Sequence, residues 1–402
     1  MNNLLDYDVV IVGAGTTGLT LAALLTQIPA LRIAVIAPSL PSLTLQPTLD
    51  CNSLMQQRRL TGWVSALTPA SRRMLENIGI WQQLPPHAVG IFQKIKIWDH
   101  QAAQLEWGRD TRSDALGYVV PNRLLQATVF ASIVHHPAIH YLSPNQLVDL
   151  SIESDRAILR LADHSTISTA LVVGADGAQS TVRSLSKIQC HSGDYEQTAL
   201  VAAVQHTKPH ISTARQVFLK SGPLAFLPLA DPYYSTIVWT TSPLQAAELA
   251  SLADADFCKR LSQTGEDRLG EIQAVCGRRS FRLYHHHCAQ YVKPHVALVG
   301  DAAHRVHPLA GQGANLGLAD SAYLAKMLTI TQRQQRPIGA IYHLKPYERK
   351  QKLRNSMIIC SIHTLRSLFA QQHQSLSLLR AFGLARLQQC AWFKHQLSGL
   401  FL

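Results

Sequence analysis

The chain has 402 residues, 47% of them hydrophobic and 15% charged, and a formal net charge of +12 at pH 7. This length exceeds what a single hydrophobic core usually supports, and the composition excludes a disordered chain, so a globular protein with two or more cores is expected. The positive charge fits an anionic membrane surface or anionic small molecules. Nucleic acid is not expected as a partner, because the basic residues form no stripe interleaved with aromatic side chains.

The seven cysteines form no Cys-x-x-Cys pair and are odd in number, which favours reduced thiols in a cytoplasmic protein over a disulfide framework. No Lys or Arg precedes the first apolar run, so a signal peptide is not expected. No apolar stretch reaches the roughly 18–20 residues that a membrane-spanning helix needs. The protein is therefore expected to be soluble, or peripheral on a membrane.

The first predicted element is a strand over residues 8–12, rich in valine and isoleucine. It is followed by the glycine turn Gly13-Ala14-Gly15-Thr16-Thr17-Gly18 and by a predicted helix over residues 19–25. In this strand–turn–helix context the first glycine makes the turn, the second admits a pyrophosphate and the third lets helix and strand pack closely. The motif therefore predicts a dinucleotide site at the start of the chain.

The second predicted strand, residues 32–36, departs from the dinucleotide-binding pattern. Such a strand usually ends in an acidic residue that binds a ribose hydroxyl, whereas this one is followed by Ala37. The chain thus lacks a charge-assisted hydrogen bond, typically worth about 1.5–3 kcal/mol. Asp50 is the one nearby acid that could compensate from a loop, and the sequence leaves this open.

The next part of the chain alternates helices and strands after an irregular segment over residues 38–62. Thr68 and Pro69 open a predicted helix that ends at Gly79, since proline is favoured in the first helical turn. A second helix begins at Asn122 and carries Arg123 near its start. Alternating apolar residues predict strands over residues 91–98, 139–142, 148–152 and 157–162.

A second strand-to-turn element follows at residues 170–183. A buried strand ends in Asp176-Gly177, and Ser180 opens a helix start. A simple Asp-Gly turn is the alternative. From residue 194 to 282 short strand-like runs dominate, joined by Gly-Pro and Asp-Pro turns, which predicts an antiparallel sheet in a second, interleaved domain.

The most informative stretch is residues 300–320. It follows an apolar strand over residues 296–299 and places Asp301 at the strand's end, where α/β proteins usually bind ligands. Pro308 breaks the chain, and the glycines from Gly311 onward let backbone approach a ligand before a helix begins. Free amides at that helix start favour an anion or an electron-rich ring edge. A glycine-rich turn without chemical meaning is the alternative.

Two further features are a run of histidines and a basic segment at the end of the chain. The run of three histidines before Cys288 suggests a metal site, but adjacent residues point in different directions and no second ligand cluster has metal spacing, so no metal is expected. After Glu348 the chain has eight Lys or Arg residues and no Asp or Glu. Two or three amphipathic helices are predicted there, either with a solvated basic face or resting on an anionic membrane.

Residues 13–18, 174–183 and 300–320 together resemble the class A flavin monooxygenases, the aromatic hydroxylases similar to para-hydroxybenzoate hydroxylase, and most closely the ubiquinone-biosynthesis hydroxylases. Residues 194–199, 222–229 and 347–349 support this resemblance, which extends over residues 5–395. It implies an α/β fold in which a Rossmann-like FAD-binding domain with a βαβ start is interleaved with an antiparallel-sheet substrate domain. The implied FAD-binding domain is residues 1–72, 98–183 and 283–348, the substrate domain is 73–97 and 184–282, and a basic helical tail is 349–402.

The resemblance also implies which residues bind FAD. The glycine turn and Arg123 would bind the ADP part, Asp176 would serve both FAD and NAD(P)H, and Asp301 would bind the ribityl chain. Backbone amides after Pro308 would face the flavin pyrimidine edge, where negative charge develops on reduction. His304 and His307 are weak candidates for a proton role. The predicted cofactor-binding residues are Gly13, Ala14, Gly15, Gly18, Arg123, Asp176, Asp301, Pro308, Gly311, Gly313, Ala314, Asn315 and Leu316.

The implied activity is hydroxylation of the ring of a polyprenylated phenol in ubiquinone biosynthesis. NAD(P)H would reduce FAD, and O2 would then give a C4a-hydroperoxyflavin that transfers a hydroxyl group to the substrate. A hydroxylase of a soluble aromatic compound, or a non-catalytic FAD-binding scaffold in a quinone-biosynthesis complex, are the alternatives. A lipid substrate would place the protein in the cytoplasm, at the inner face of the cytoplasmic membrane or in a complex of pathway enzymes.

Several positions differ from the family pattern. Ala37 replaces the ribose-binding acid, Trp63 stands where Arg is usual, Pro121 replaces a Glu, and Arg282 replaces a Pro. Arg58 or Arg59 could substitute for the missing arginine. Because most of these changes concern the cofactor, we expect weak retention of FAD.

Overall fold

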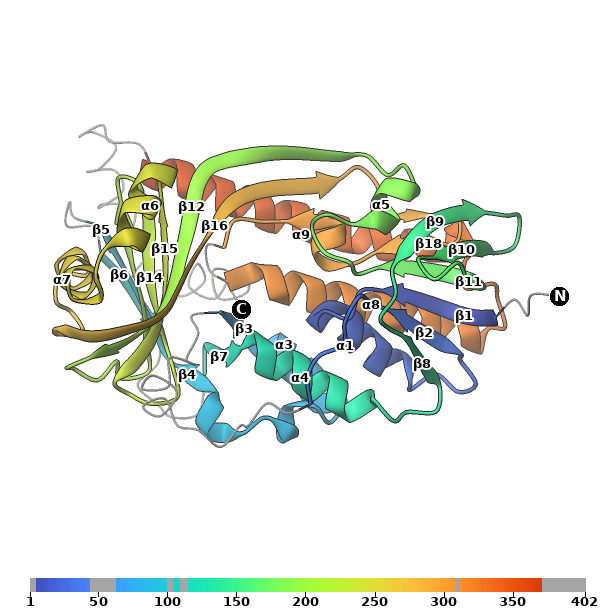
Figure 1. The fold of residues 1–402 in the computed structure, drawn as a ribbon, viewed down its shortest axis with the longest axis horizontal. Coiled ribbons are helices and arrows are strands. Elements are labelled where there is room, and N and C mark those ends of the chain that lie inside the picture. The colour runs from blue at the N-terminus through green and yellow to red at the C-terminus, as the bar shows by residue number, and fades with distance from the viewer. Residues whose placement is uncertain (1–4, 44–62, 100–103, 109–114, 309–310, 371–402) are drawn as a thin grey trace.

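Two eight-stranded sheets and one three-stranded sheet organise the residues that the computed structural model describes, which are 5–43, 63–99, 104–108, 115–308 and 311–370. The two large sheets lie toward opposite ends of an elongated molecule, and long strands and helices run between them (Figure 1). The predicted α/β fold with an antiparallel second domain is confirmed.

The first large sheet has the order β17-β18-β11-β1-β2-β8, with β10 and β9 attached to β11. Its central strands are parallel and buried on both faces, which explains their continuous apolar runs. Helix α1 follows β1 directly, as the glycine turn predicts. The elements are β1 (Leu5–Val12), α1 (Thr16–Leu25), β2 (Ile33–Ile36), β8 (Ile139–Leu142), β9 (Leu147–Ile152), β10 (Ala157–Leu161), β11 (Thr166–Gly174), α5 (Thr181–Leu185), β17 (Val292–Lys293) and β18 (Val296–Leu298).

The second large sheet has the order β19-β16-β12-β15-β14-β13-β5-β6 and is antiparallel except for the β13–β5 pair. Two helices that the sequence analysis did not predict, α6 and α7, pack on one face and form a separate core with it. The elements are β5 (Lys94–Asp99), β6 (Gln104–Gly108), β12 (Cys190–His206), β13 (Thr213–Leu219), β14 (Gly222–Pro228), β15 (Tyr234–Thr241), α6 (Pro243–Ser251), α7 (Asp254–Thr264), β16 (Ile272–Cys288) and β19 (His304–Arg305).

The small sheet has the strand order β3-β7-β4 and lies between the two large sheets (Figure 1). The predicted helix after Thr68 is confirmed as α3, with the Thr68 side chain accepting a hydrogen bond from the Ser71 amide and Pro69 in the first turn. The elements are β3 (Val64–Leu67), α3 (Pro69–Asn77), the short helices η1 (Trp81–Gln83) and η2 (Pro86–Ala88), β4 (Gly90–Phe92), β7 (Gly117–Pro121) and α4 (Asn122–Ile133).

Three of the expected domain boundaries need correction. Residues 73–89 pack into the core of the first sheet through Leu75, Ile80 and Leu84, rather than with the substrate domain. Strand β6, expected in the FAD-binding domain, pairs with β5 in the second sheet. The end of β16, also expected in the FAD-binding domain, remains paired with β12, because these two long strands extend continuously from one end of the molecule toward the other (Figure 1).

The expectation of reduced cysteines is wrong for one pair, because Cys190 and Cys288 form a disulfide. These residues begin β12 and end β16, where the antiparallel register places them opposite each other. They are 98 residues apart in the chain, so no short spacing motif reveals the pair. Among the described residues, Cys258 and Cys360 are free thiols.

Two long helices complete the described chain: α8 (Gln312–Arg333) and α9 (Ile341–Ala370). The helices predicted after Glu348 begin with α9, which starts earlier, before Pro346, and runs unbroken to residue 370. It is no detached tail: Leu344 and Tyr347 lie in the first core, and Ile358 packs against Leu316 and Phe218. Residues 371–402 of the predicted tail lie outside the described residues. No helix in the described part of the chain is long and apolar enough to cross a membrane.

Candidate cofactor and substrate site

A cavity of about 680 Å³ lies between the first sheet and one face of the second. Residues from both large sheets, from the small sheet and from the start of α8 line it. Eight residues singled out from the sequence lie on its wall, namely Gly15, Arg123, Asp301, His307, Pro308, Gly311, Gly313 and Ala314.

The glycine turn after β1 forms one end of this cavity. A Cβ on Gly13, which has φ +114°, would lie 2.3 Å from the Ala175 carbonyl oxygen, and one on Gly18 would lie 2.1 Å from the Gly13 carbonyl oxygen. These two glycines therefore serve the packing of the turn. A Cβ on Gly15 would meet nothing within 4 Å, so this residue leaves open space on the cavity wall.

Helix α4 provides the charged group at this end. Arg123, in its first turn, is exposed and lines the cavity together with Gln126, whose side-chain amide donates to the Ala14 carbonyl oxygen at 2.7 Å. An arginine beside the amides of a helix start is the arrangement that binds a pyrophosphate. The predicted roles of the glycine turn and Arg123 fit this geometry.

Positions that depart from the family pattern are accommodated in different ways. Ala37 is buried, and its backbone bonds to residues 142 and 145. Trp63 lines the cavity with its ring 5.2 Å from that of Phe281. Arg282 forms an ion pair with Asp194 at 2.6 Å on the surface. Residues 44–62, which include Asp50, Arg58 and Arg59, lie outside the described residues.

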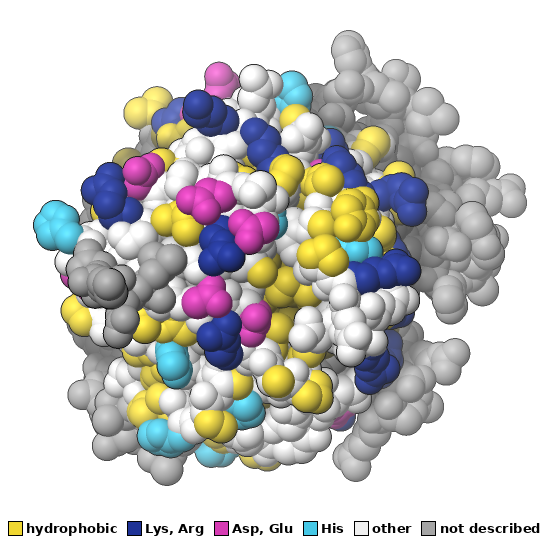
Figure 2. Space-filling model, turned by 90° about the vertical axis from the view of Figure 1, so that its right-hand side faces the viewer, with side chains coloured by type: hydrophobic (Ala, Val, Ile, Leu, Met, Phe, Trp, Pro, Cys, Tyr) yellow, Lys and Arg dark blue, Asp and Glu magenta, His cyan; other side chains and the backbone are white. Residues whose placement is uncertain are grey.

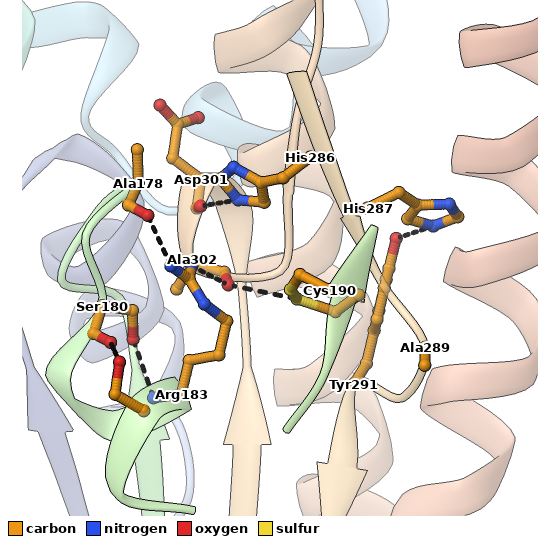
Figure 3. The surroundings of a disulfide bond; sticks show 12 residues. Ala178, Ser180, Arg183, Cys190, His286, His287, Ala289, Tyr291, Asp301 and Ala302 are labelled. Atoms are coloured by element: carbon orange, nitrogen blue, oxygen red, sulfur yellow. Dashed lines mark hydrogen bonds between the residues drawn. A yellow bond between two sulfur atoms is a disulfide. The ribbon is translucent and has the colours of Figure 1, made fainter. Parts of the chain in front are cut away.

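Asp301 lies on a short 3-10 turn, η3 (Gly300–Ala302), after β18. This turn lies next to the glycine turn, since a Cβ on Gly300 would lie 3.1 Å from the Thr17 side chain. Asp301 lines the cavity, and in Figure 3 its carboxylate points away from the hydrogen bonds that hold its backbone. Burial raises the pKa of this carboxyl above its usual range, and the nearby His304 and Arg305 lower it by less. The turn is well held: His286 donates to the Asp301 carbonyl oxygen at 2.7 Å, and Arg183 donates to that of Ala302 at 2.9 Å.

The start of α8 divides into residues that face the cavity and residues that hold the helix. Gly311 is left-handed, with φ +64°, and a Cβ on Gly313 would meet nothing within 4 Å, so free space lies beside the first helical turn. Asn315 is buried, accepting from the Thr68 amide and the Ser71 hydroxyl and donating to the Ala66 carbonyl oxygen. The side chains of Asn315 and of the buried Leu316 therefore serve the fold, and neither residue lines the cavity.

Asp176 contacts the start of α5. One carboxylate oxygen accepts hydrogen bonds from the Thr181 and Val182 amides, at 2.7 and 3.1 Å, and so caps α5. The other oxygen is buried without a hydrogen-bond partner in the described structure. Its neighbours Ala175 and Gly177 line the cavity, but Asp176 itself does not. Its role toward FAD and NAD(P)H stays a prediction.

The two candidate histidines have different surroundings. His304 is buried away from the cavity, and its Nε2 lies 2.5 Å from Asp320. His307 lines the cavity and packs edge-on against Tyr195, with ring centroids 5.0 Å apart. The structure therefore removes His304 from contact with substrate and leaves His307 on the cavity wall.

A β-bulge brings Tyr195 to this position. The register of β12 against β16 shifts between Asp194 and Thr198, and Glu196 adopts φ +54°, which turns Tyr195 into the interior. The Tyr195 hydroxyl also lies 3.3 Å from Nε2 of His363 on α9. The three consecutive histidines diverge: His286 and His287 bond to the Asp301 carbonyl oxygen and the Tyr291 hydroxyl, while His285 packs against Tyr195.

The sequence analysis missed the substrate side of the cavity. Every second residue of the strands in the second sheet faces it, as the alternation of side chains along a strand requires. Their period-two pattern was the available signal, but it does not reveal which face is free, because the other face packs on α6 and α7. These cavity residues are Ile95, Ile97, Leu105, Trp107, Ala214, Gln216, Phe218, Pro223, Ala225, Leu227, Val238 and Thr240.

The geometry suits an elongated dinucleotide cofactor. One end offers a helix start, open space at Gly15 and an arginine, which suit a pyrophosphate. The neighbouring segments offer Asp301 and the space beside Gly313, which suit a polyol chain and the edge of a ring. The residues present therefore fit FAD, whose flavin ring would lie against the apolar face of the second sheet.

Comparisons with known proteins agree. Residues 65–354 match the family described as FAD binding domain. The chain is 33% identical over 382 residues to ubiquinone hydroxylase UbiL of Rhodospirillum rubrum, covering 95% of this chain and 86% of the relative. It is 30% identical over 334 residues to the 3-demethoxyubiquinol 3-hydroxylase of Escherichia coli, covering 83% and 85%. PqsL, a probable FAD-dependent monooxygenase from Pseudomonas aeruginosa, has the same fold, with a TM-score of 0.76, 21% identity, and 95% and 100% coverage.

The chain therefore belongs to the FAD-dependent monooxygenases, in the family that contains the ubiquinone-biosynthesis hydroxylases. The predicted enzyme class and FAD as cofactor are confirmed. These findings do not test the roles of individual residues.

Proposed function

We propose that this enzyme hydroxylates the aromatic ring of a polyprenylated phenol in ubiquinone biosynthesis, using NAD(P)H and O2. The observation that carries the proposal is the apolar face of the second sheet, which lies directly across the cavity from the FAD-binding residues. The names of the relatives, UbiL and the 3-demethoxyubiquinol 3-hydroxylase, support a substrate of this class.

Some residues of the chain would bind FAD, and others would exclude water from the site. When bound, FAD supplies the chemistry: it takes electrons from NAD(P)H and activates O2 for transfer to the ring. Gly15 and Arg123 would hold the cofactor phosphates, and Asp301 would hold the ribityl hydroxyls. Amides at the start of α8 offset negative charge at the edge of the ring, where a helix dipole is favourable.

The second sheet would hold the substrate. Its cavity face is built from aliphatic and aromatic side chains, including Phe218 and Trp107, which favour a prenyl chain and keep water away from the reacting atoms. Gln216 and Thr240 are polar groups on this face and would orient the phenol hydroxyl. Such a mixture of apolar walls and a few polar groups is typical of sites that orient a hydrophobic ligand.

Turnover tests the proposal. The purified protein, supplied with FAD, NAD(P)H and O2, is offered phenols with and without prenyl chains, and products are identified by mass spectrometry. We expect a hydroxylated product and stimulated NAD(P)H oxidation with the prenylated phenols. Product from unprenylated phenols alone would contradict the substrate class, and absence of flavin reduction under all conditions would favour a scaffold. The variant Arg123→Ala, which should weaken FAD binding, serves as the negative control.

The proposal extends to contact with an anionic membrane through α9. Its outward positions carry basic and apolar side chains, Lys345, Arg349, Leu353 and Met357, with Leu353 63% and Met357 54% exposed. A similar grouping of Lys and Arg lies along the right-hand edge of the face in Figure 2, with few acidic side chains beside it. Such a helix face suits acidic lipid headgroups and would place the enzyme beside its lipid substrate.

Vesicle co-sedimentation tests this contact. We expect binding to vesicles containing phosphatidylglycerol, weaker binding at high salt, and a loss in the double variant Leu353→Glu, Met357→Glu. Substitution of the exposed Leu244 on α6 by glutamate is the matched control and should change nothing. Equal binding to neutral vesicles, or no effect of the double variant, would contradict contact through this face of α9.

A further inference from the structure

The motif that contains Asp301 ends in another acidic residue, Asp320, which is completely buried in α8. One of its carboxylate oxygens accepts from the Gly300 amide at 3.0 Å and from Nε2 of His304 at 2.5 Å. The other accepts from the side-chain amide of Asn355 on α9 at 3.3 Å. A buried carboxylate with three donors is costly to desolvate and is tolerated only because these donors surround it.

The two donors on the first oxygen stand on either side of Asp301. Gly300 precedes it, and His304 follows it by three residues, so a single oxygen closes the segment into a loop. Contacts from other elements hold the residues between them: His286 and Arg183 bond to the carbonyl oxygens of Asp301 and Ala302 (Figure 3). The segment is therefore held at both ends and along its middle, while the Asp301 carboxylate alone extends into the cavity.

The sequence around Asp320 makes this arrangement possible. A Cβ on Gly317 would lie 2.6 Å from Oγ1 of Thr17 and 3.3 Å from Cα of Gly300, so glycine allows α8 to pass directly beneath the turn. Asp320 comes three residues later, about one helical turn, and thus lies under the same segment. Gly300 itself has φ +59°, a conformation that needs support from its surroundings.

We propose that Asp320 is a positioning residue for FAD, which acts by fixing the direction of Asp301. The carboxylate holds the Gly300 amide and the His304 ring, and together these set where the Asp301 side chain points in the cavity. Asn355 extends the same support to α9, since its amide lies 3.4 Å from the Tyr291 hydroxyl as well. Asp320 does not line the cavity and touches no cofactor itself.

A double-mutant cycle on the full chain tests whether Asp320 acts on FAD binding through Asp301. FAD is titrated into the wild-type apoprotein and into Asp320→Asn, Asp301→Asn and the double variant, and the dissociation constant is read from flavin fluorescence. We expect each single substitution to weaken FAD binding about tenfold or more, because each removes hydrogen bonds to a charged group. If Asp320 acts through Asp301, its substitution has little further effect in the Asp301→Asn background.

Two additional measurements separate positioning from simple loss of stability. The visible circular dichroism of bound FAD should change in Asp320→Asn, since the ring would be held differently. Gln351→Leu is the matched control: this equally buried α9 side chain donates to the neighbouring Ala319 carbonyl oxygen, and its loss should leave FAD affinity unchanged. Where Asp320→Asn does not fold, His304→Gln and Asn355→Leu take its place in the cycle. The proposal would be overturned if the double variant raised the dissociation constant of FAD by the product of the two single effects. Wild-type FAD affinity in Asp320→Asn would also overturn it.

Discussion

The two ends of the cofactor site are built on different principles. At the flavin end, bonds from several elements hold the segment around Asp301: His286 from β16, Arg183 from α5 and Asp320 from α8. At the adenosine end, the turn after β1 depends on glycines that leave no room for a side chain, and β2 ends in Ala37. The first end is fixed by polar contacts, and the second by the absence of side chains.

This difference indicates where the protein can vary without losing its chemistry. A close-packed glycine turn cannot accept a side chain, whereas the anchored turn keeps its fold when one contact is weakened. A missing ribose contact lowers affinity but leaves the geometry of the reacting ring unchanged. We therefore expect flavin chemistry to be intact and cofactor affinity to be low, and the following changes test that comparison.

The largest effect is expected from Gly18→Ala at the adenosine end. Its new Cβ would lie 2.1 Å from the Gly13 carbonyl oxygen, so the turn must shift, at a cost of about 3 kcal/mol in the free energy of unfolding. Gly15→Ala is the matched control: its Cβ meets no protein atom within 4 Å, so we expect normal unfolding but weaker FAD binding. Urea denaturation and FAD titration measure both. Normal stability of Gly18→Ala would contradict the close-packing argument.

A gain is expected from Ala37→Glu, which restores the acidic residue at the end of β2. One charge-assisted hydrogen bond of about 1.5–3 kcal/mol corresponds to roughly 10- to 100-fold tighter FAD binding. The flavin content of the purified wild-type protein, measured before and after FAD is added, is the reference against which Ala37→Glu is compared. Tight and stoichiometric flavin in the wild-type protein as isolated would refute weak retention.

Acidification should weaken the flavin end through His286. Burial lowers the pKa of this histidine to about 4, so it stays neutral in the folded protein, while in the unfolded chain it binds a proton near its ordinary value of 6.5. Stability is therefore present above pH 6.5 and lost as pH falls toward 4, by about 2 kcal/mol between pH 7 and 5.

A pair of variants isolates this effect. His286→Gln should reduce the pH dependence of unfolding by that amount and also change FAD affinity. His206, whose pKa burial likewise lowers to about 4, lies on the second sheet, bonded to Ser235. His206→Gln should reduce the same pH dependence without affecting FAD binding. Identical FAD titrations for the two variants would remove His286 from the anchoring of the turn.

The smallest effect is expected on the stability of Asp301→Asn. Because burial raises the pKa of this carboxyl, its contribution to stability is present below pH 3.8 and lost as pH rises through the folded-state pKa. The variant apoprotein should therefore be at least as stable as wild type at pH 7, although it binds FAD less well. Denaturation at pH 7 and pH 4 measures this, and a clear loss of stability at pH 7 would contradict it.

Local sequence patterns predicted much of the FAD-binding half correctly. The strand–turn–helix start, the helix capped by Thr68, the strand before Asp176 and the helix after Gly311 are confirmed with small shifts at their ends. Each depends on short-range signals, such as glycine at a left-handed position or proline in a first helical turn. The helices α6 and α7 were missed because the surrounding strand-like runs outweighed their signals.

Within the site, the sequence by itself determined several residues that line the cavity: Gly15, Arg123 and Asp301, which were predicted to bind FAD, lie on its wall. Only the tertiary structure decided which side chains serve the fold instead. Asn315 and His304 belong to the same motif as Asp301, yet their side chains bond inward, to Thr68 and Asp320. The Cys190–Cys288 disulfide and the apolar substrate face join residues far apart in the chain. Such pairings depend on strand register and on which sheet face remains free, and a local pattern contains neither.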